Sequence, residues 1–207
     1  MTPYNCFGHR IASIAAERGG SDPSFHELTQ IAIIPLGNDY GLLKGKAPFH
    51  VYIKPVYPER LDREGVPIRK AVYERIMDGI SRDDAIAALE SWVKSLSLGF
   101  TQKGWPRRIM PLGCEYNQDY SFIVNWLGPT LYNELFHNHT RDVMSLAISI
   151  NDYEAFRMRE TPFRNMNLTQ LCGQLDVEYY NKHDCLSEAV SIAKLYCKLL
   201  QWKAPTV

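Results

Sequence analysis

The segment that most constrains the fold of this chain is 111–122, with the sequence PLGCEYNQDYSF. The apolar residues at 109–112 predict a short buried strand, and the apolar residues that follow the segment recur at helical spacing. Asp119 is therefore expected where a strand has ended and a helix begins, the place where ligands gather in open α/β sheets. A simpler interpretation is that its carboxylate only complements the dipole of that helix from the first turn.

Length and composition indicate one globular domain. The 207 residues fit a single domain, expected to span 1–207 with a loose N-terminal segment at 1–9. Apolar residues make up 45% and charged residues 22%, as in ordinary globular proteins. No apolar run has the length of a membrane span, and no basic segment followed by an apolar stretch marks a secretory signal. No membrane contact is therefore predicted.

Cysteine and charge content narrow the class of protein further. The five cysteines are scattered and include no CxxC pair, which argues against a disulfide framework or a zinc site and favours a reducing, cytoplasmic compartment. The formal net charge is zero, so binding of nucleic acid through bulk positive charge is not expected. An enzyme that contacts a few nucleotides at one local patch remains compatible with this charge.

Three strands are predicted in the first part of the chain. Residues 10–16 alternate in polarity, 28–36 contain the continuous apolar run IAII, and 49–53 alternate again. Their short connections suggest an antiparallel meander. Because residues two apart share one face of a strand, Ala15 and Glu17 are predicted to point the same way.

Helices dominate the remainder of the chain. They are expected at 68–77, 81–96, 129–136, 168–175 and 184–202. Gly99 is predicted to end the second of these helices, and Asp142 marks a passage from strand to helix. Residues 151–167 carry no clear pattern. The order of elements predicts an α/β layer fold.

A second group of polar residues precedes the last helix. His183 and Glu188 are five positions apart, which would separate them by about 140° on one helix. They converge only if His183 belongs to the loop that enters the helix, with Asp184 as its N-cap. The simpler interpretation is an exposed histidine beside a capping aspartate, with Glu188 complementing the helix dipole.

Together these segments resemble the DEDDh group of 3′–5′ exonucleases, the DnaQ-like branch of the ribonuclease H-like fold. That family carries Asp-x-Glu on its first strand, Gly-His-Asn-x-x-Phe-Asp-x-x-Phe after a later strand, Asp-Thr-x-x-Leu-Ala, and His-x-Ala-x-x-Asp-Ala before its last helix. The corresponding segments here are IAAERGG at 14–20, GCEYNQDYSF at 113–122, RDVMSLA at 141–147 and HDCLSEA at 183–189. The resemblance implies a mixed five-stranded sheet, three antiparallel strands and then two parallel ones, flanked by helices.

Two positions depart from the family pattern. Ala15 stands where the family has its first catalytic aspartate, and Glu188 where it has its last. Family members hold two divalent cations, Mg²⁺ or Mn²⁺, on four carboxylates. A glutamate adds one carbon, about 1.5 Å, to the side chain, whereas a methyl group cannot bind a cation. The resemblance thus implies Glu17, Asp119 and Glu188 as metal ligands, Ala15 as the position of a missing ligand, and His183 as the general base.

The implied function is a metal-dependent 3′–5′ exonuclease that releases nucleoside 5′-monophosphates from the 3′ end of single-stranded DNA or RNA, inactivated in this chain by Ala15. The alternative is a non-catalytic pseudo-exonuclease that binds nucleic acid or a protein. Ala15 is compatible with an engineered change or with a natural pseudoenzyme, and the retained Glu17, Asp119 and His183 favour the engineered change. The sequence leaves open the kind of nucleic acid and whether the protein is a homodimer.

Two further groups are candidates for contacts with nucleic acid. Phosphates are expected to be steered by Arg157, Arg159 and Arg164, although three arginines are more often a solvated face. Bases are expected to stack on Tyr116 and Tyr120, as aromatic side chains do in proteins that bind single strands.

Overall fold

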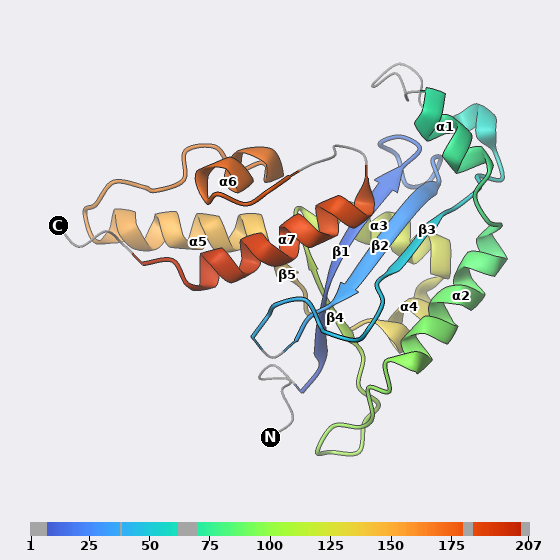
Figure 1. Ribbon diagram of the computed structural model, residues 1–207, viewed down its shortest axis with the longest axis horizontal. Coiled ribbons are helices and arrows are strands. Elements are labelled where there is room, and N and C mark those ends of the chain that lie inside the picture. The colour runs from blue at the N-terminus through green and yellow to red at the C-terminus, as the bar shows by residue number, and fades with distance from the viewer. Residues whose placement is uncertain (1–7, 38, 62–69, 180–183, 204–207) are drawn as a thin grey trace.

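A twisted five-stranded sheet with helices on both faces forms the centre of the computed structural model, which describes residues 8–37, 39–61, 70–179 and 184–203 (Figure 1). The strand order across the sheet is β3-β2-β1-β4-β5. The strands are β1 (Arg10–Arg18), β2 (Leu28–Pro35), β3 (Phe49–Tyr52), β4 (Ile109–Gly113) and β5 (Arg141–Asp142). β2 is antiparallel to β1 and β3, while β1, β4 and β5 are parallel. The predicted mixed sheet and α/β fold are confirmed.

Seven α-helices and one 3₁₀ turn are present in the described ranges. The helices are α1 (Lys70–Met77), α2 (Arg82–Ser95), α3 (Tyr116–Leu127), α4 (Pro129–Leu135), α5 (Val143–Phe156), α6 (Leu168–Gln174) and α7 (Cys185–Leu200), and the 3₁₀ turn is Pro58–Arg60. In Figure 1, α7 crosses the front of β1 and β2, α3 lies behind the sheet, and α5 and α6 extend to the side of α7. None of these helices is long and apolar enough to cross a membrane.

The side chains of β1 alternate between two hydrophobic cores, one on each face of the sheet. Ala12 and Ile14 belong to the core beneath α3, whereas Ala15 belongs to the core beneath α7. Ser13, on the same face as Ala15, donates its hydroxyl to the carbonyl oxygen of Ala189 in α7 at 2.7 Å. This face of β1 is therefore fastened directly to the last helix.

Three boundaries differ from the sequence-based expectation. β1 continues to Arg18 instead of ending at residue 16. α2 ends at Ser95, because the chain turns through a left-handed residue at Ser97 (φ 51°), two residues before Gly99. α5 continues to Phe156, well into the range that carried no clear pattern.

Candidate active site

Three acidic side chains gather at the end of the sheet where β1 and β4 finish. Glu17 is the penultimate residue of β1, while Asp119 and Glu188 lie in the first turns of α3 and α7. Their charges act on one another, since Glu188 and Glu17 both raise the pKa of Asp119. The sheet therefore brings together three carboxylates from segments far apart in the sequence, at the edge where open α/β sheets bind ligands.

Asp119 is the most deeply placed of the three carboxylates. Its exposed fraction is 9%, and burial, partly offset by the Arg18 cation, raises its pKa from 3.8 to about 7. Burial disfavours the charged form of a carboxyl group, and nearby carboxylates add to that effect. The protonated and ionised forms of Asp119 are thus of similar stability near neutral pH.

Arg18 is the cationic partner of Asp119 and was missed at the level of sequence. Its Nε lies 3.8 Å from Asp119 Oδ1, and its Nη1 donates to Gln118 Oε1 at 3.3 Å. The guanidinium carbon also lies 5.5 Å from the centre of the Phe122 ring. A signal was available in the sequence, because strand alternation continued for two residues beyond the predicted end at residue 16 places Arg18 on the α3 face.

Glu188 has a partner of a different kind. The Tyr179 hydroxyl donates to Glu188 Oε1 at 2.7 Å, from the segment that follows α6. Burial, together with this hydrogen bond, raises the pKa of Tyr179 well above its ordinary value. Tyr179 therefore remains a neutral donor at physiological pH. No local sequence pattern marks it, because it lies in an irregular segment outside any motif.

Ala15 contributes a buried methyl group on the α7 face of β1. Its exposed fraction is 3%, and it packs in the same core as Ala189 and Cys185. The pKa of the Cys185 thiol is raised strongly by burial and then by Glu17 and Glu188, so this side chain also lies close to the carboxylates. The floor of the site at this point is apolar.

The turn between β4 and α3 positions Asp119. A Cβ at Gly113 would lie 2.7 Å from Tyr116 Cβ, so the turn requires glycine there. Asp142 accepts the Tyr116 N–H at 3.0 Å through Oδ2 and the Ser145 N–H at 3.0 Å through Oδ1. One carboxylate thus holds the starts of α3 and α5 together, which places the first turn of α3 at the edge of the sheet.

The donor set suits a divalent cation chemically but is incomplete. Carboxylate oxygens are preferred ligands of Mg²⁺ and Mn²⁺, and Glu17, Asp119 and Glu188 supply them. Ala15 supplies none, and in the described ranges no group of three His, Cys, Asp or Glu side chains is arranged to hold a metal ion. Of the four positions expected to supply a carboxylate, the described residues therefore supply three. His183, the expected general base, lies outside the described residues; Asp184 caps α7 by accepting the Leu186 N–H at 3.2 Å, as predicted.

The arginines expected to steer phosphates lie apart from the carboxylates. Arg157 and Arg159 follow the C-terminal end of α5, which in Figure 1 points away from the start of α7. Arg157 donates to the Tyr153 hydroxyl at 2.9 Å, and Arg159 pairs with the buried Glu154 at 3.4 Å. Arg164 is exposed in the connection between α5 and α6. The structure does not bring these arginines to the carboxylate cluster.

The two tyrosines expected to stack on bases differ in exposure. Tyr116 has an exposed fraction of 2%, and its hydroxyl is 3.1 Å from that of Tyr132 inside the α3-side core. Its assignment as a stacking residue was wrong, because the first turn of α3 directs this ring inward. Tyr120 is 43% exposed, with its ring edge-to-face on Tyr132, so its predicted role stays open.

Known proteins match this chain in structure and not in sequence. No protein-family model and no curated protein matches the sequence. Among solved structures, E. coli exonuclease I in complex with a dT13 oligonucleotide aligns with a TM-score of 0.61 and 16% identity over 95% of this chain. A zinc ion bound form of the E. coli exonuclease I–ssDNA complex aligns with a TM-score of 0.64 and 16% identity.

The chain spans 42% of the dT13-bound exonuclease I chain and 41% of the zinc-bound one. The nuclease domain of 3′hExo, a DEDDh family member bound to rAMP, aligns with a TM-score of 0.64 and 17% identity, over 93% of this chain and 92% of that domain. At these identities the comparison concerns architecture. It shows that this chain has the ribonuclease H-like fold of the DEDDh exonucleases.

Proposed function

We propose that this chain is a 3′–5′ exonuclease domain whose hydrolytic site is disabled by Ala15. The observation that carries the proposal is the mutual electrostatic interaction of Glu17, Asp119 and Glu188 at the sheet edge. Like charges held close together destabilise a protein unless a cation or a proton compensates them. A cluster of this kind is therefore typical of a site for cations, and the fold supports the nuclease class.

The proposed substrate is the 3′ end of single-stranded DNA or RNA. Solved proteins of this fold hold a dT13 oligonucleotide, a dA16 oligonucleotide or rAMP, which supports a nucleic-acid ligand here. In the proposed active form Glu17, Asp119, Glu188 and an aspartate at position 15 would hold two cations, Mg²⁺ or Mn²⁺. Such cations would supply activation of water and stabilisation of the leaving oxygen, and His183 would serve as the general base toward that water.

A second candidate, a binding module that never cleaves, is favoured by one specific observation. Asp119 is paired with Arg18, and Glu188 accepts a hydrogen bond from Tyr179. A guanidinium beside one carboxylate and a hydroxyl on another lower the need for a metal ion. In this alternative the same end of the sheet holds a nucleic-acid end without divalent cations.

The Ala15→Asp substitution separates the two candidates. The assay follows 5′-labelled and 3′-labelled single strands with Mg²⁺ or Mn²⁺, with a chelator as control. We expect mononucleotide release from the 3′ end in the Ala15→Asp protein and background cleavage in the original chain. Ala15→Asn is the matched control, because it adds nearly the same volume without a charge that can bind a cation.

Thermal unfolding supplies a readout that does not depend on activity. Without metal, Ala15→Asp is expected to be less stable than Ala15→Asn, because it adds a charge to a crowded acidic site. Mn²⁺ should restore stability to the aspartate variant only, since a ligand that binds the folded state stabilises it. If Mn²⁺ shifts neither variant and all forms bind oligonucleotide equally in chelator, the exonuclease proposal fails and the binding module stands.

A further inference from the structure

The connection between α2 and β4 projects from the end of the molecule opposite the carboxylate cluster. In Figure 1 it is the green loop below the sheet, whereas the C-terminal end of β1, near Glu17, points upward. Two aromatic side chains on this loop are largely exposed, Phe100 at 66% and Trp105 at 69%. Large aromatic side chains are costly to leave in water, so a pair of them on one projecting loop indicates a contact surface.

The loop is a built structure that holds both rings outward. The Thr101 N–H donates to the Trp105 carbonyl at 2.8 Å, and the Gly104 N–H donates to the Thr101 carbonyl at 2.9 Å. Phe100 and Pro106 form an antiparallel bridge, and the Arg107 N–H donates to the Gly99 carbonyl at 3.0 Å. These bonds form a short hairpin, so the exposure of the rings follows from its geometry.

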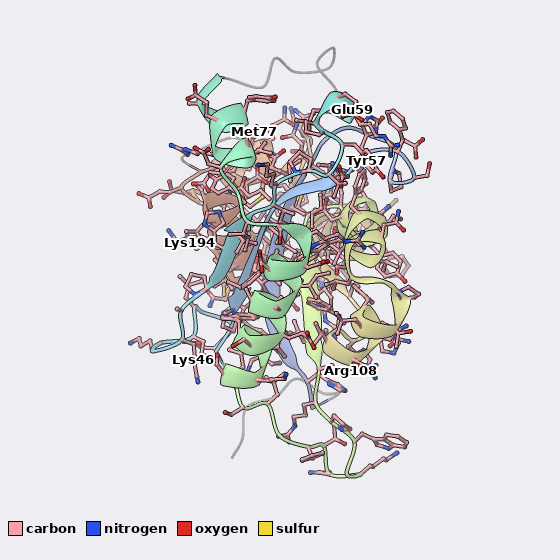
Figure 2. The ribbon with its side chains drawn as sticks, turned by 90° about the vertical axis from the view of Figure 1, so that its right-hand side faces the viewer. Lys46, Tyr57, Glu59, Met77, Arg108 and Lys194 are labelled. Atoms are coloured by element: carbon pink, nitrogen blue, oxygen red, sulfur yellow. The ribbon has the colours of Figure 1, made fainter. Side chains whose placement is uncertain are left out.

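Positive charge surrounds the hairpin. From 91 to 114 the sequence contains four cationic side chains, Lys94, Lys103, Arg107 and Arg108, and no Asp or Glu. Lys46 joins them from the loop before β3, because its Nζ donates to the Ser95 carbonyl at 2.7 Å. Figure 2 shows Lys46 and Arg108 in the lower half of the molecule, on opposite sides of α2, with the hairpin below them.

Arg108 links the hairpin to α4 and to a group of histidines. Its Nη1 donates to the Asn133 carbonyl of α4 at 2.8 Å, and the exposed Glu134 is the next residue there. The backbone N–H of Arg108 donates to His9 Nδ1 at 3.0 Å, which leaves the ring proton of neutral His9 on Nε2. The ring of His137 lies 4.3 Å from that of His9.

Burial is the main cause of the lowered pKa values of the two histidines, and nearby cations contribute to them. Burial and the Arg108 and Arg107 cations lower the pKa of His9. Burial lowers the pKa of His137 to about 4, and the charges of His9 and Arg108 act in the same direction. Although the formal net charge of the chain is zero, this end of the molecule opposes further positive charge and favours an anion.

We propose that this surface, formed by Phe100, Lys103, Trp105, Arg108 and Lys46, binds single-stranded nucleic acid. The cations contact phosphates, and the two rings stack on unpaired bases. An acidic polypeptide matches the charge equally well, but it supplies no succession of flat faces for two exposed rings. The inference goes beyond the proposed function, because it uses none of the carboxylates and holds whether or not the chain cleaves its ligand.

The test measures binding of a fluorescein-labelled dT oligonucleotide by anisotropy, in chelator, with the tryptophan emission of the protein as a second signal. Trp105→Ala is expected to weaken binding about 5- to 150-fold, the range for loss of one stacked base. Trp105→Phe, which keeps an aromatic ring, should retain most of the affinity. Stacking should also quench the emission of the original protein and leave that of Trp105→Ala unchanged.

The charge component is tested through salt dependence. Lys103→Glu should reduce the slope of log K against log salt by about 0.7, the value for one phosphate contact on a single strand. Lys198→Glu, the same change on the exposed side of α7, is the matched control and should leave the slope unchanged. Equal affinities of Trp105→Ala and the original protein would overturn the proposal. Equal competition by polyglutamate and by oligonucleotide would overturn it in favour of an acidic protein partner.

Discussion

The pKa of Asp119 leads to a measurable prediction about stability. A carboxyl group whose pKa is higher in the folded than in the unfolded state binds more protons when folded, so it lowers stability as pH rises through the interval between the two values. For Asp119 that interval runs from 3.8 to about 7. The Asp119→Asn substitution removes the ionisation and keeps the size and most of the polarity of the side chain.

The size of the change in unfolding free energy follows from the difference between the two pKa values of Asp119. Each pH unit between the two pKa values corresponds to about 1.4 kcal/mol, so ionising Asp119 in the folded protein costs on the order of 4 kcal/mol between pH 4 and pH 8. The free energy of unfolding of Asp119→Asn minus that of the original protein should therefore rise by about this amount over the interval. The rise should be complete slightly above pH 7.

The difference in unfolding free energy between Asp119→Asn and the original protein isolates the effect of Asp119. His9 and His137 have lowered pKa values, so they make stability rise with pH below about 6.5 and oppose the effect of Asp119 in either protein alone. Subtracting one curve from the other cancels their contribution. Urea unfolding at a series of pH values, without divalent cations, supplies both curves. Parallel curves would refute the argument, because they would mean that Asp119 ionises as easily in the folded as in the unfolded chain.

Two further substitutions test the surroundings of Asp119. Arg18→Gln removes the cation that lowers the Asp119 pKa, so the pH-dependent loss of stability should extend to higher pH. At pH 8 this variant should lose about 0.5–1 kcal/mol more, because the pair is partly exposed. An unchanged dependence of the unfolding free energy on pH in urea would count against the pair. Gly113→Ala should cost about 1–3 kcal/mol, since its Cβ would lie 2.7 Å from Tyr116 Cβ. Its control, Gly173→Ala in α6, meets nothing within 4 Å and should stabilise by up to about 1 kcal/mol; equal thermal stability of the two variants would contradict the crowding at Gly113.

The strands were predictable because their burial is regular. β2 is buried along its whole length, and β1 alternates between two cores, so both produce simple apolar patterns. α5 was partly missed because two polar residues, Asn151 and Glu154, lie on its buried side. The amide of Asn151 hydrogen-bonds both the N–H and the carbonyl of Phe163. Tertiary partners of this kind make buried polar residues acceptable, and they leave no trace in local periodicity.

The candidate site was predictable where it follows motifs and not where it depends on packing. Glu17, Asp119 and Glu188 were named because the motifs around them resemble those of the DEDDh exonucleases. Tyr179 was not, because its contact with Glu188 depends on how the segment after α6 folds back. The inward direction of Tyr116 was likewise hidden, since its partner Tyr132 belongs to another helix.

The hydrogen bond between Ser13 and Ala189 joins residues 176 positions apart. Closing a loop of that length costs chain entropy before any contact compensates it. Contacts of such high sequence separation slow folding, and they form only after the last helix has been synthesised. The carboxylate of Glu188 can join those of Glu17 and Asp119 only when α7 docks on β1. Any partially folded form that lacks this docking also lacks the cluster of three carboxylates, so nascent chains assemble it only in the last step of folding.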